Sequence, residues 1–179
     1  MFIKLLGKLP LFQGLSEGEL EELLTYFDHE SFQKGEEVLT EYQGEEEVKM
    51  YVILGGAVEI VKRAMNQEER EISLDVLKTG EIFGEMKIVD VLVRSATVRA
   101  IKDTQTISIS KENLERLLEE NPRIYGILMR NIARRLSHRL RKADTFQATM
   151  LSKEGRGQAE FSQKSSSSEE KENGLETKS

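Results

Sequence analysis

Short runs of alternating hydrophobic and polar residues fill the middle of the chain, and glycines stand between many of these runs. The strand-forming segments are residues 36–41, 48–54, 56–63, 70–77, 96–101 and 104–109. Closely spaced strands with turn residues between them are typical of a small antiparallel barrel or jelly roll. The pattern therefore predicts a mainly β domain.

Helices are predicted on both sides of the strands. Ser16 and Glu19 have the spacing of a capping box, which predicts a helix over about residues 17–27 with an apolar buried face. After the strands, Ser110 is expected to cap a short helix around residues 111–119.

A longer helix is predicted from Pro122 to about Lys142, with Asn121 as its cap and proline in its first turn. Its apolar residues follow a four-residue spacing: Ile124, Leu128, Ile132, Leu136 and Leu140, with Ile127 beside them. This face must be covered by another element. The same helix carries a series of basic residues: Arg123, Arg130, Arg134, Arg135, Arg139, Arg141 and Lys142. They form either a solvated face that partly complements the acidic residues of segment 17–30, or a docking surface for an acidic partner, lipid head groups or nucleic acid.

The periodic pattern stops near Asp144. Residues 165–173 are rich in serine and glutamate and have neither the apolar content nor the period to fold alone. We therefore predict a disordered tail rich in serine, glutamate and lysine over residues 146–179. Within it, Met150 and Leu151 could extend the helix or touch a partner.

Composition narrows the class of protein. A chain of 179 residues suffices for one core with appendages, and a net charge of −6 gives no overall field that favours nucleic acid. The chain has no cysteine, which excludes disulfides and thiolate chemistry. No apolar run approaches the roughly eighteen residues that span a bilayer, and no signal peptide is recognisable. We therefore expect a cytoplasmic protein without a transmembrane segment.

Enzymatic chemistry finds little support. His29 and His138 are the only histidines, they are predicted on helices or helix edges, and no paired metal-ligand spacing surrounds them. Gly14-Leu15-Ser16-Glu17-Gly18 has the letters of a Gly-x-Ser-x-Gly motif, but no strand is predicted before it, so it is not a nucleophile elbow. The sequence predicts a protein that is not an enzyme and holds no metal or cofactor.

The most informative stretch is residues 83–90, followed by Arg94 and Ser95. Gly84 permits unusual dihedral angles and a close approach of the backbone to a ligand. A helical turn at 86–90 would direct N–H groups at an anion, and the guanidinium of Arg94 suits two phosphate oxygens. Glu85 needs a hydrogen-bond donor, for which a ribose 2′-hydroxyl is suitable. Together these residues describe a pocket for a small phosphate ester.

Phe-Gly-Glu-Met, followed nine residues after its Glu by Arg-Ser-Ala-Thr-Val, resembles the phosphate-binding cassette of the cyclic nucleotide-binding domain family. That family includes regulatory subunits of cyclic AMP-dependent kinase, domains of cyclic nucleotide-gated channels and bacterial regulators such as the cyclic AMP receptor protein. The resemblance covers residues 8–142, through motifs at residues 9–16, 32–36, 50–58 and 77–82.

The resemblance implies a double-stranded β-helix, or jelly-roll barrel, with an N-terminal helix and a C-terminal helical lid. It also implies a site for cyclic AMP (cAMP) or cyclic GMP (cGMP), with cAMP expected first. The expected ligand-binding residues are Gly84, Glu85, Met86, Lys87, Arg94 and Ser95. Such a regulatory domain would signal through its C-terminal helix to an unidentified output protein, and helix 122–142 could form a homodimer.

Some features depart from the family pattern. Lys87 occupies a position where ligand-binding members usually have a small residue, Val93 replaces a common proline, and residues 45–47 add acidic length to a loop. The alternative function is therefore a degenerate, ligand-free module that acts as a protein interaction scaffold. After the long helix, neither length nor composition remains for a helix-turn-helix, so sequence-specific DNA binding by this chain alone is not expected.

Overall fold

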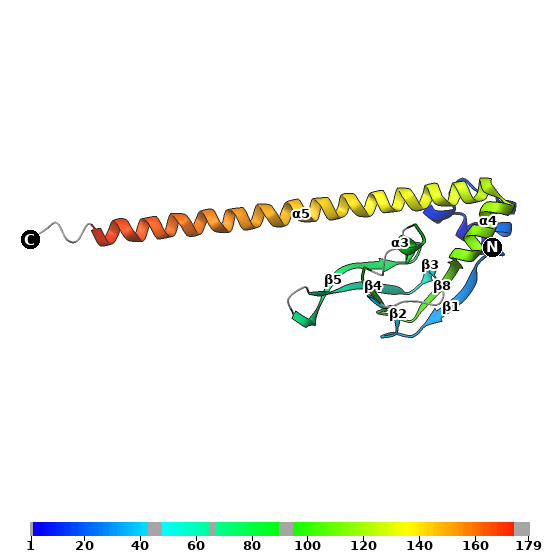
Figure 1. Ribbon diagram of the computed structural model, residues 1–179, viewed down its shortest axis with the longest axis horizontal. Coiled ribbons are helices and arrows are strands. Elements are labelled where there is room, and N and C mark those ends of the chain that lie inside the picture. Colours follow the sequence, from blue (N-terminus) through cyan, green and yellow to red (C-terminus); the bar gives the residue numbers. More distant parts are fainter. Residues whose placement is uncertain (1, 43–47, 65–66, 90–94, 174–179) are drawn as a thin grey trace, which may run out of the picture. The chain divides into compact units, whose positions relative to one another are not determined.

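The computed structural model describes residues 2–42, 48–64, 67–89 and 95–173. The elements are α1 (Phe2–Leu6), η1 (Pro10–Phe12), α2 (Glu17–Leu24), β1 (Asp28–Phe32), β2 (Glu37–Leu39), β3 (Lys49–Gly55), β4 (Ala57–Ala64), β5 (Gln67–Lys78), β6 (Ile82–Phe83), α3 (Glu85–Val89), β7 (Thr97–Ala100), β8 (Thr104–Ser110), α4 (Lys111–Glu120) and α5 (Pro122–Asn173) (Figure 1). The chain divides into two compact units, unit 1 (Met1–Ile132) and unit 2 (Ala133–Ser179), and α5 contributes to both. Each unit is described by itself.

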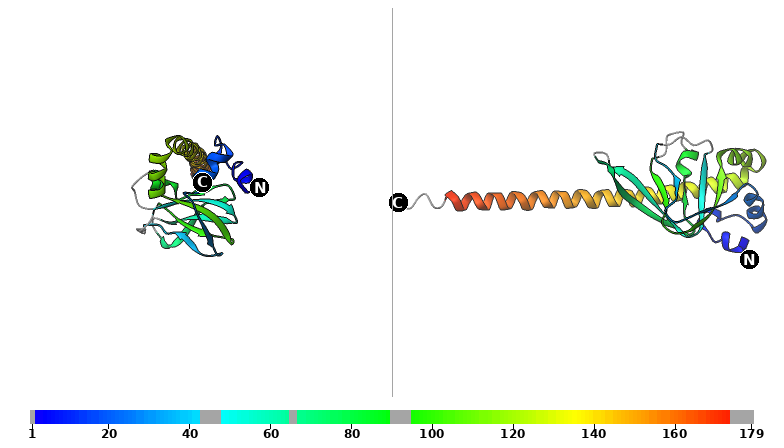
Figure 2. Two further views of the ribbon diagram at one scale, coloured as in Figure 1. Left: turned by 90° about the vertical axis from the view of Figure 1, so that its right-hand side faces the viewer. Right: turned by 90° about the horizontal axis from the view of Figure 1, so that it is seen from below.

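Unit 1 contains two antiparallel four-stranded sheets, with strand orders β1-β8-β3-β6 and β2-β7-β4-β5. Figure 2 shows the strands gathered into two layers. Neighbours in a sheet are mostly distant in sequence, as for β1 and β8, where Asp28 pairs with Ser108. This architecture confirms the predicted mainly β jelly roll with flanking helices.

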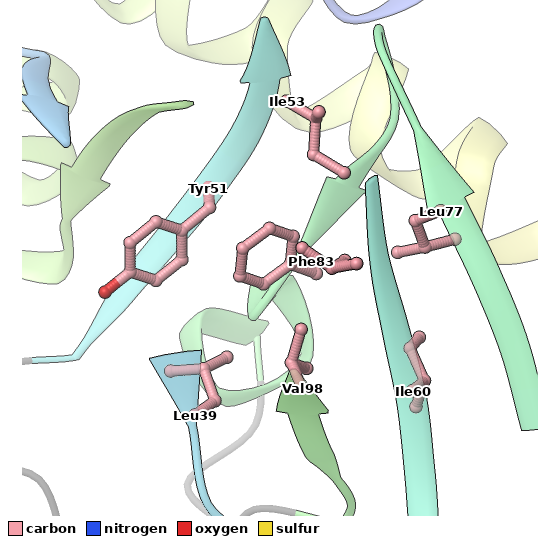
Figure 3. Close-up of a cluster of buried hydrophobic side chains, with 8 residues drawn as sticks. Leu39, Tyr51, Ile53, Ile60, Leu77, Phe83 and Val98 are labelled. Atoms are coloured by element: carbon pink, nitrogen blue, oxygen red, sulfur yellow. The ribbon is translucent and has the colours of Figure 1, made fainter. Parts of the chain in front are cut away.

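The core lies between the two sheets and draws its side chains from both. Figure 3 shows the central cluster, which consists of Leu39, Tyr51, Ile53, Val58, Ile60, Leu77, Phe83 and Val98. All of these side chains are at most 7% exposed. Burial of this apolar surface is the main force that holds the sheets face to face.

The predicted helix caps are confirmed. The Ser16 hydroxyl accepts a hydrogen bond from the Glu19 N–H, and the Glu19 carboxylate accepts one from the Ser16 N–H at 2.9 Å. Ser110 Oγ accepts from the Asn113 N–H at 3.1 Å, and Asn121 Oδ1 accepts from the Ile124 N–H at 3.2 Å. These side chains satisfy N–H groups that a helix cannot pair internally.

The first part of α5 belongs to unit 1 and has a covered apolar face. Ile124, Leu128 and Ile132 are at most 1% exposed, as their spacing predicted. Leu140, further along the predicted stripe, is 63% exposed. The apolar stripe is therefore buried only along its first turns.

The end predicted for the long helix near Lys142 is wrong, because α5 continues to Asn173. α5 includes residues 146–173, and the disorder predicted for residues 146–179 stays a prediction. The predicted end relied on the loss of an apolar period, which reports burial of one helix face, and a helix can continue without a buried face. No described helix is long and apolar enough to cross a membrane.

Two strands were missed from the sequence. β1 is the polar segment Asp28-His29-Glu30-Ser31-Phe32, so His29 lies in a strand rather than near a helix. Its partner β8 is more than seventy residues away, and local pattern gives no sign of that pairing. β6 has only two residues, Ile82 and Phe83. Such a short strand carries no readable alternation.

Candidate functional site

The segment that carries the predicted pocket connects the two sheets. β6 lies at the edge of one sheet, where Phe83 pairs with Tyr51 of β3. The chain then passes through Gly84 and α3 and reaches β7, which lies inside the other sheet between β2 and β4. Both ends of the segment are therefore held by strand pairing.

Gly84 has a φ of +79°, in the left-handed region that favours glycine. This residue forms a bend between the end of β6 and the first residue of α3. The unusual dihedral angle predicted for Gly84 is therefore confirmed. A side chain at this position would be strained.

Glu85 is the first residue of α3 and is 1% exposed. A buried carboxylate is tolerated only with hydrogen-bonding or charged partners. Glu85 does have a partner in the structure, so it is not an isolated charge. Its burial distinguishes it from an ordinary surface glutamate.

The other predicted site residues differ in exposure. Met86 is 53% exposed, Lys87 is half-buried and Ser95 is exposed. Arg94 lies outside the described residues, as does Val93. The structure thus brings Gly84, Glu85, Met86 and Lys87 together in one turn, whereas the place of Arg94 stays a prediction.

Phe83 belongs to the core. The side chain is 1% exposed, and its ring stacks on the ring of Tyr51 with the centroids 4.8 Å apart (Figure 3). Packing of this side chain fixes the backbone directly before Gly84.

Glu41 is a buried carboxylate that the sequence did not reveal. It is 3% exposed, its N–H donates to Thr97 Oγ1 at 3.0 Å, and its Oε2 accepts from the Arg63 N–H at 3.2 Å. Among the residues that the structure describes, none forms a hydrogen bond with its Oε1. Thr97 is the first residue of β7, so Glu41 fastens the strand that follows the candidate site. Its sequence surroundings gave no sign of this burial.

Arg99 holds the same strand from its polar side. Its two Nη atoms donate to both carboxylate oxygens of Glu71 at 2.8 and 3.0 Å, and Nη2 also donates to Glu37 at 2.8 Å. These hydrogen bonds raise the pKa of Arg99 and lower the pKa of Glu71. The guanidinium of Arg99 thus joins β7 to β2 and β5. These hydrogen bonds anchor the strand that follows the candidate site.

Metal chemistry has no visible basis in the described part of the chain. Residues 2–42, 48–64, 67–89 and 95–173 contain no group of three or more histidine, aspartate or glutamate side chains placed to hold an ion. The candidate site is therefore described by a glycine turn, a buried carboxylate and the first turn of α3.

Known proteins are similar to this chain in sequence and in fold. The sequence model of the cyclic nucleotide-binding domain matches residues 29–121. The cyclic AMP receptor protein of Thermus thermophilus is 33% identical over 135 residues, which are 75% of this chain and 59% of that protein. The potassium channel KAT1 of rice is 29% identical over 78% of this chain but only 19% of the channel.

A solved structure shows the same arrangement in space. The crystal structure of a cyclic nucleotide-binding domain from Methylobacillus flagellatus superposes with a TM-score of 0.70 at 25% identity, covering 78% of this chain and 76% of that one. The chain spans less than two thirds of the length of the curated relatives named above. Similarity therefore extends to a domain of these proteins and leaves the rest of them unmatched.

Proposed function

The chain belongs to the cyclic nucleotide-binding domain family, and we propose that it is a regulatory sensor that binds a cyclic nucleotide, with cAMP as the first candidate. The observation that carries this proposal is the buried Glu85 directly after the left-handed Gly84. The Thermus relative, named a cyclic AMP receptor protein, supports cAMP over cGMP.

In the proposed complex, the backbone of Gly84 and the N–H groups at the start of α3 approach the cyclic phosphate. Arg94 and Ser95 complete this anion site, with Arg94 supplying the compensating charge. Glu85 accepts a hydrogen bond from the ribose 2′-hydroxyl. Met86 and Lys87 contribute their backbone, and the partly exposed Lys87 leaves its ammonium available to solvent or to the phosphate.

The proposed output passes through α5, because the start of this helix is fastened to unit 1. Asn131 Nδ2 donates to the Leu11 and Gln13 carbonyls at 2.8 and 2.9 Å, and Ile124 and Ile132 are buried. A ligand can act on an output protein, or on a second copy paired through residues 122–142, only if its affinity differs between two arrangements. No chemical step, cofactor or sequence-specific DNA contact is part of this proposal, and the cytoplasmic location predicted above belongs to it.

Calorimetric titration of the full chain with cAMP, cGMP and linear 5′-AMP tests the proposal. We expect cAMP to bind and 5′-AMP, which lacks the cyclic diester, to bind much more weakly. Arg94→Ala should weaken cAMP binding by about 2 kcal/mol, the scale of a charge-assisted hydrogen-bond pair. Arg123→Ala is a matched control, because Arg123 pairs with Glu19 on the surface of unit 1.

A second titration tests the role of Glu85. The unmodified chain should prefer cAMP to its 2′-deoxy analogue, and Glu85→Gln should lose most of this preference while Met86→Ala keeps it. Absence of heat with every nucleotide at millimolar concentration would instead favour the ligand-free interaction scaffold. Lys87 is the feature that supports this second function, because ligand-binding members of the family usually have a small residue at this position.

A further inference from the structure

The part of α5 that lies in unit 2 combines strong positive charge with exposed apolar side chains. Residues 133–152 contain five basic side chains and one acidic one, Asp144, although the whole chain has a net charge of −6. The basic residues are Arg134, Arg135, Arg139, Arg141 and Lys142. The positive charge is therefore concentrated on one helical segment of an acidic protein.

Large apolar side chains on this segment are open to solvent. Leu140 is 63% exposed, Phe146 62%, Met150 43% and Leu151 61%. Single exposed apolar residues are ordinary, but four of them within three turns of one helix form a surface that favours a partner.

The apolar side chains share one side of the helix, and most of the basic side chains lie outside that side. At about 100° per residue, Leu140, Phe146, Met150 and Leu151 fall within an arc of about 140°. Arg134 and Arg141 project on the opposite side, and Lys142 lies between the two sides. Arg135 lies just outside the edge of the apolar arc beside Phe146, and Arg139 lies just inside that edge. An apolar face with basic residues on and beside the other face is the pattern of helices that lie in a membrane interface.

We propose that the segment Ala133–Ser152 binds to the surface of a membrane that contains anionic lipids. Its apolar arc enters the boundary between head groups and acyl chains, and its basic side chains contact lipid phosphates. The long stems of Arg135 and Arg139 suit this position, because an arginine at the edge of an apolar face can reach the head groups with its guanidinium. This inference does not depend on binding of a cyclic nucleotide by unit 1.

Other occupants explain fewer of these features. Nucleic acid would use the basic side but leave Leu140, Phe146 and Leu151 in water. A second copy paired side by side along this segment would bring together two helices that each carry a large excess of positive charge. An anionic lipid surface accounts for both the charge and the apolar arc.

The test is co-sedimentation of the full chain with vesicles of phosphatidylcholine alone and vesicles in which a quarter of the lipid is phosphatidylglycerol. We expect binding to the anionic vesicles only, with weakening as salt is raised. Arg134→Gln combined with Arg141→Gln should lower the partition coefficient by about fivefold for each charge. Leu140→Ser combined with Phe146→Ser, which keeps every charge, should lower it by about tenfold or more.

Ser137→Ala, an exposed change on the same helix, is the control and should bind as the unmodified chain does. Circular dichroism checks that each variant keeps its helix. The salt dependence of vesicle binding is measured on the unmodified chain, so it tests the proposal even if a variant fails to fold. Equal binding to neutral and anionic vesicles, or none to either, would overturn the proposal. The proposal would also be overturned if light scattering showed that the Leu140 and Phe146 changes convert a dimer to a monomer and neither form bound vesicles.

Discussion

The ring of Phe83 lies parallel to the ring of Tyr51, with 4.8 Å between the centroids and 7° between the planes. The two residues are direct partners in the pairing of β6 with β3, and both are buried. Gly84 follows Phe83 immediately, so the stacked pair determines where the left-handed turn and α3 begin. The candidate site is therefore anchored in the core by the residue next to it.

A double-mutant cycle measures this anchor. Phe83→Leu and Tyr51→Leu should each lower the free energy of unfolding by about 1–2 kcal/mol, because each loses ring contacts but keeps apolar volume. Together they should lose less than the sum, with a coupling of about 0.5–1.5 kcal/mol, the usual contribution of an aromatic pair. Urea denaturation of the four proteins supplies the values, and Met86→Ala, at an exposed position, is the control. Strict additivity would mean that the stack contributes nothing beyond apolar burial.

The features that could be predicted from the sequence are those set by neighbouring residues. The capping box of Ser16 and Glu19 involves residues three apart, so its chemistry is readable locally and the structure has it. The Gly84 turn is equally local. The strands with clear alternation were found with their ends shifted by a few residues, since their hydrophobic positions face one core.

The features that escaped prediction depend on distant partners. β1 is a polar segment that becomes a strand only because β8 pairs with it, and Glu41 is buried because Thr97 and the Arg63 backbone meet it. Neither the pairing of β1 with β8 nor the burial of Glu41 can be recognised from the neighbouring residues in the sequence. At the candidate site, the turn and the burial of Glu85 follow from the described residues, whereas Arg94 lies outside them and its role stays a prediction.

Gly56 is expected to tolerate no side chain. Its φ is +91°, and a Cβ there would lie 2.4 Å from the Asp103 carbonyl oxygen and 2.7 Å from Thr104 Cα. Because those atoms belong to the backbone, Gly56→Ala should destabilise the fold by about 2 kcal/mol or more. Gly126 is the matched control, since it is helical and a Cβ there would meet nothing within 4 Å. Gly126→Ala should stabilise by about 0.5–1 kcal/mol, and thermal unfolding should show opposite shifts for the two variants.

Glu19 should make stability depend on acid pH. Hydrogen bonds from the N–H and hydroxyl of Ser16, together with Arg123, lower the pKa of its carboxyl from 4.5 to about 2. A carboxyl whose pKa is lower in the folded state stabilises the protein above the unfolded pKa, and this contribution disappears as the pH falls through the folded pKa. Glu19→Gln should therefore unfold at a lower temperature than the unmodified protein at pH 7.

The difference in unfolding temperature should shrink between pH 4.5 and about 2, because protonated Glu19 then resembles glutamine. Glu17→Gln is the control: that carboxylate lies on the same turn but makes only a 4.0 Å ion pair with Lys4. The control should produce a smaller difference at pH 7. A constant difference between the Glu19 variant and the unmodified protein over the whole range would show that the charge of Glu19 is not what stabilises the cap.

Asn131 should be the residue that holds the N-terminal segment to α5. It is 2% exposed, and its amide nitrogen donates to the carbonyls of Leu11 and Gln13 at 2.8 and 2.9 Å. Asn131→Ala leaves both carbonyl oxygens without this donor, which should cost about 2–4 kcal/mol of unfolding free energy. Asn131→Asp keeps the size of the side chain but replaces the donor with a carboxylate oxygen at neutral pH.

The aspartate variant separates hydrogen bonding from packing. If the two hydrogen bonds hold the segment, Asn131→Asp should be at least as destabilised as the alanine variant at pH 7, because its charge then faces two carbonyl oxygens. It should recover in part at acid pH, where the protonated carboxyl can donate again. If packing alone matters, the aspartate variant should stay close to the unmodified protein, and Ser137→Ala, exposed on the same helix, sets the baseline in denaturant unfolding at both pH values.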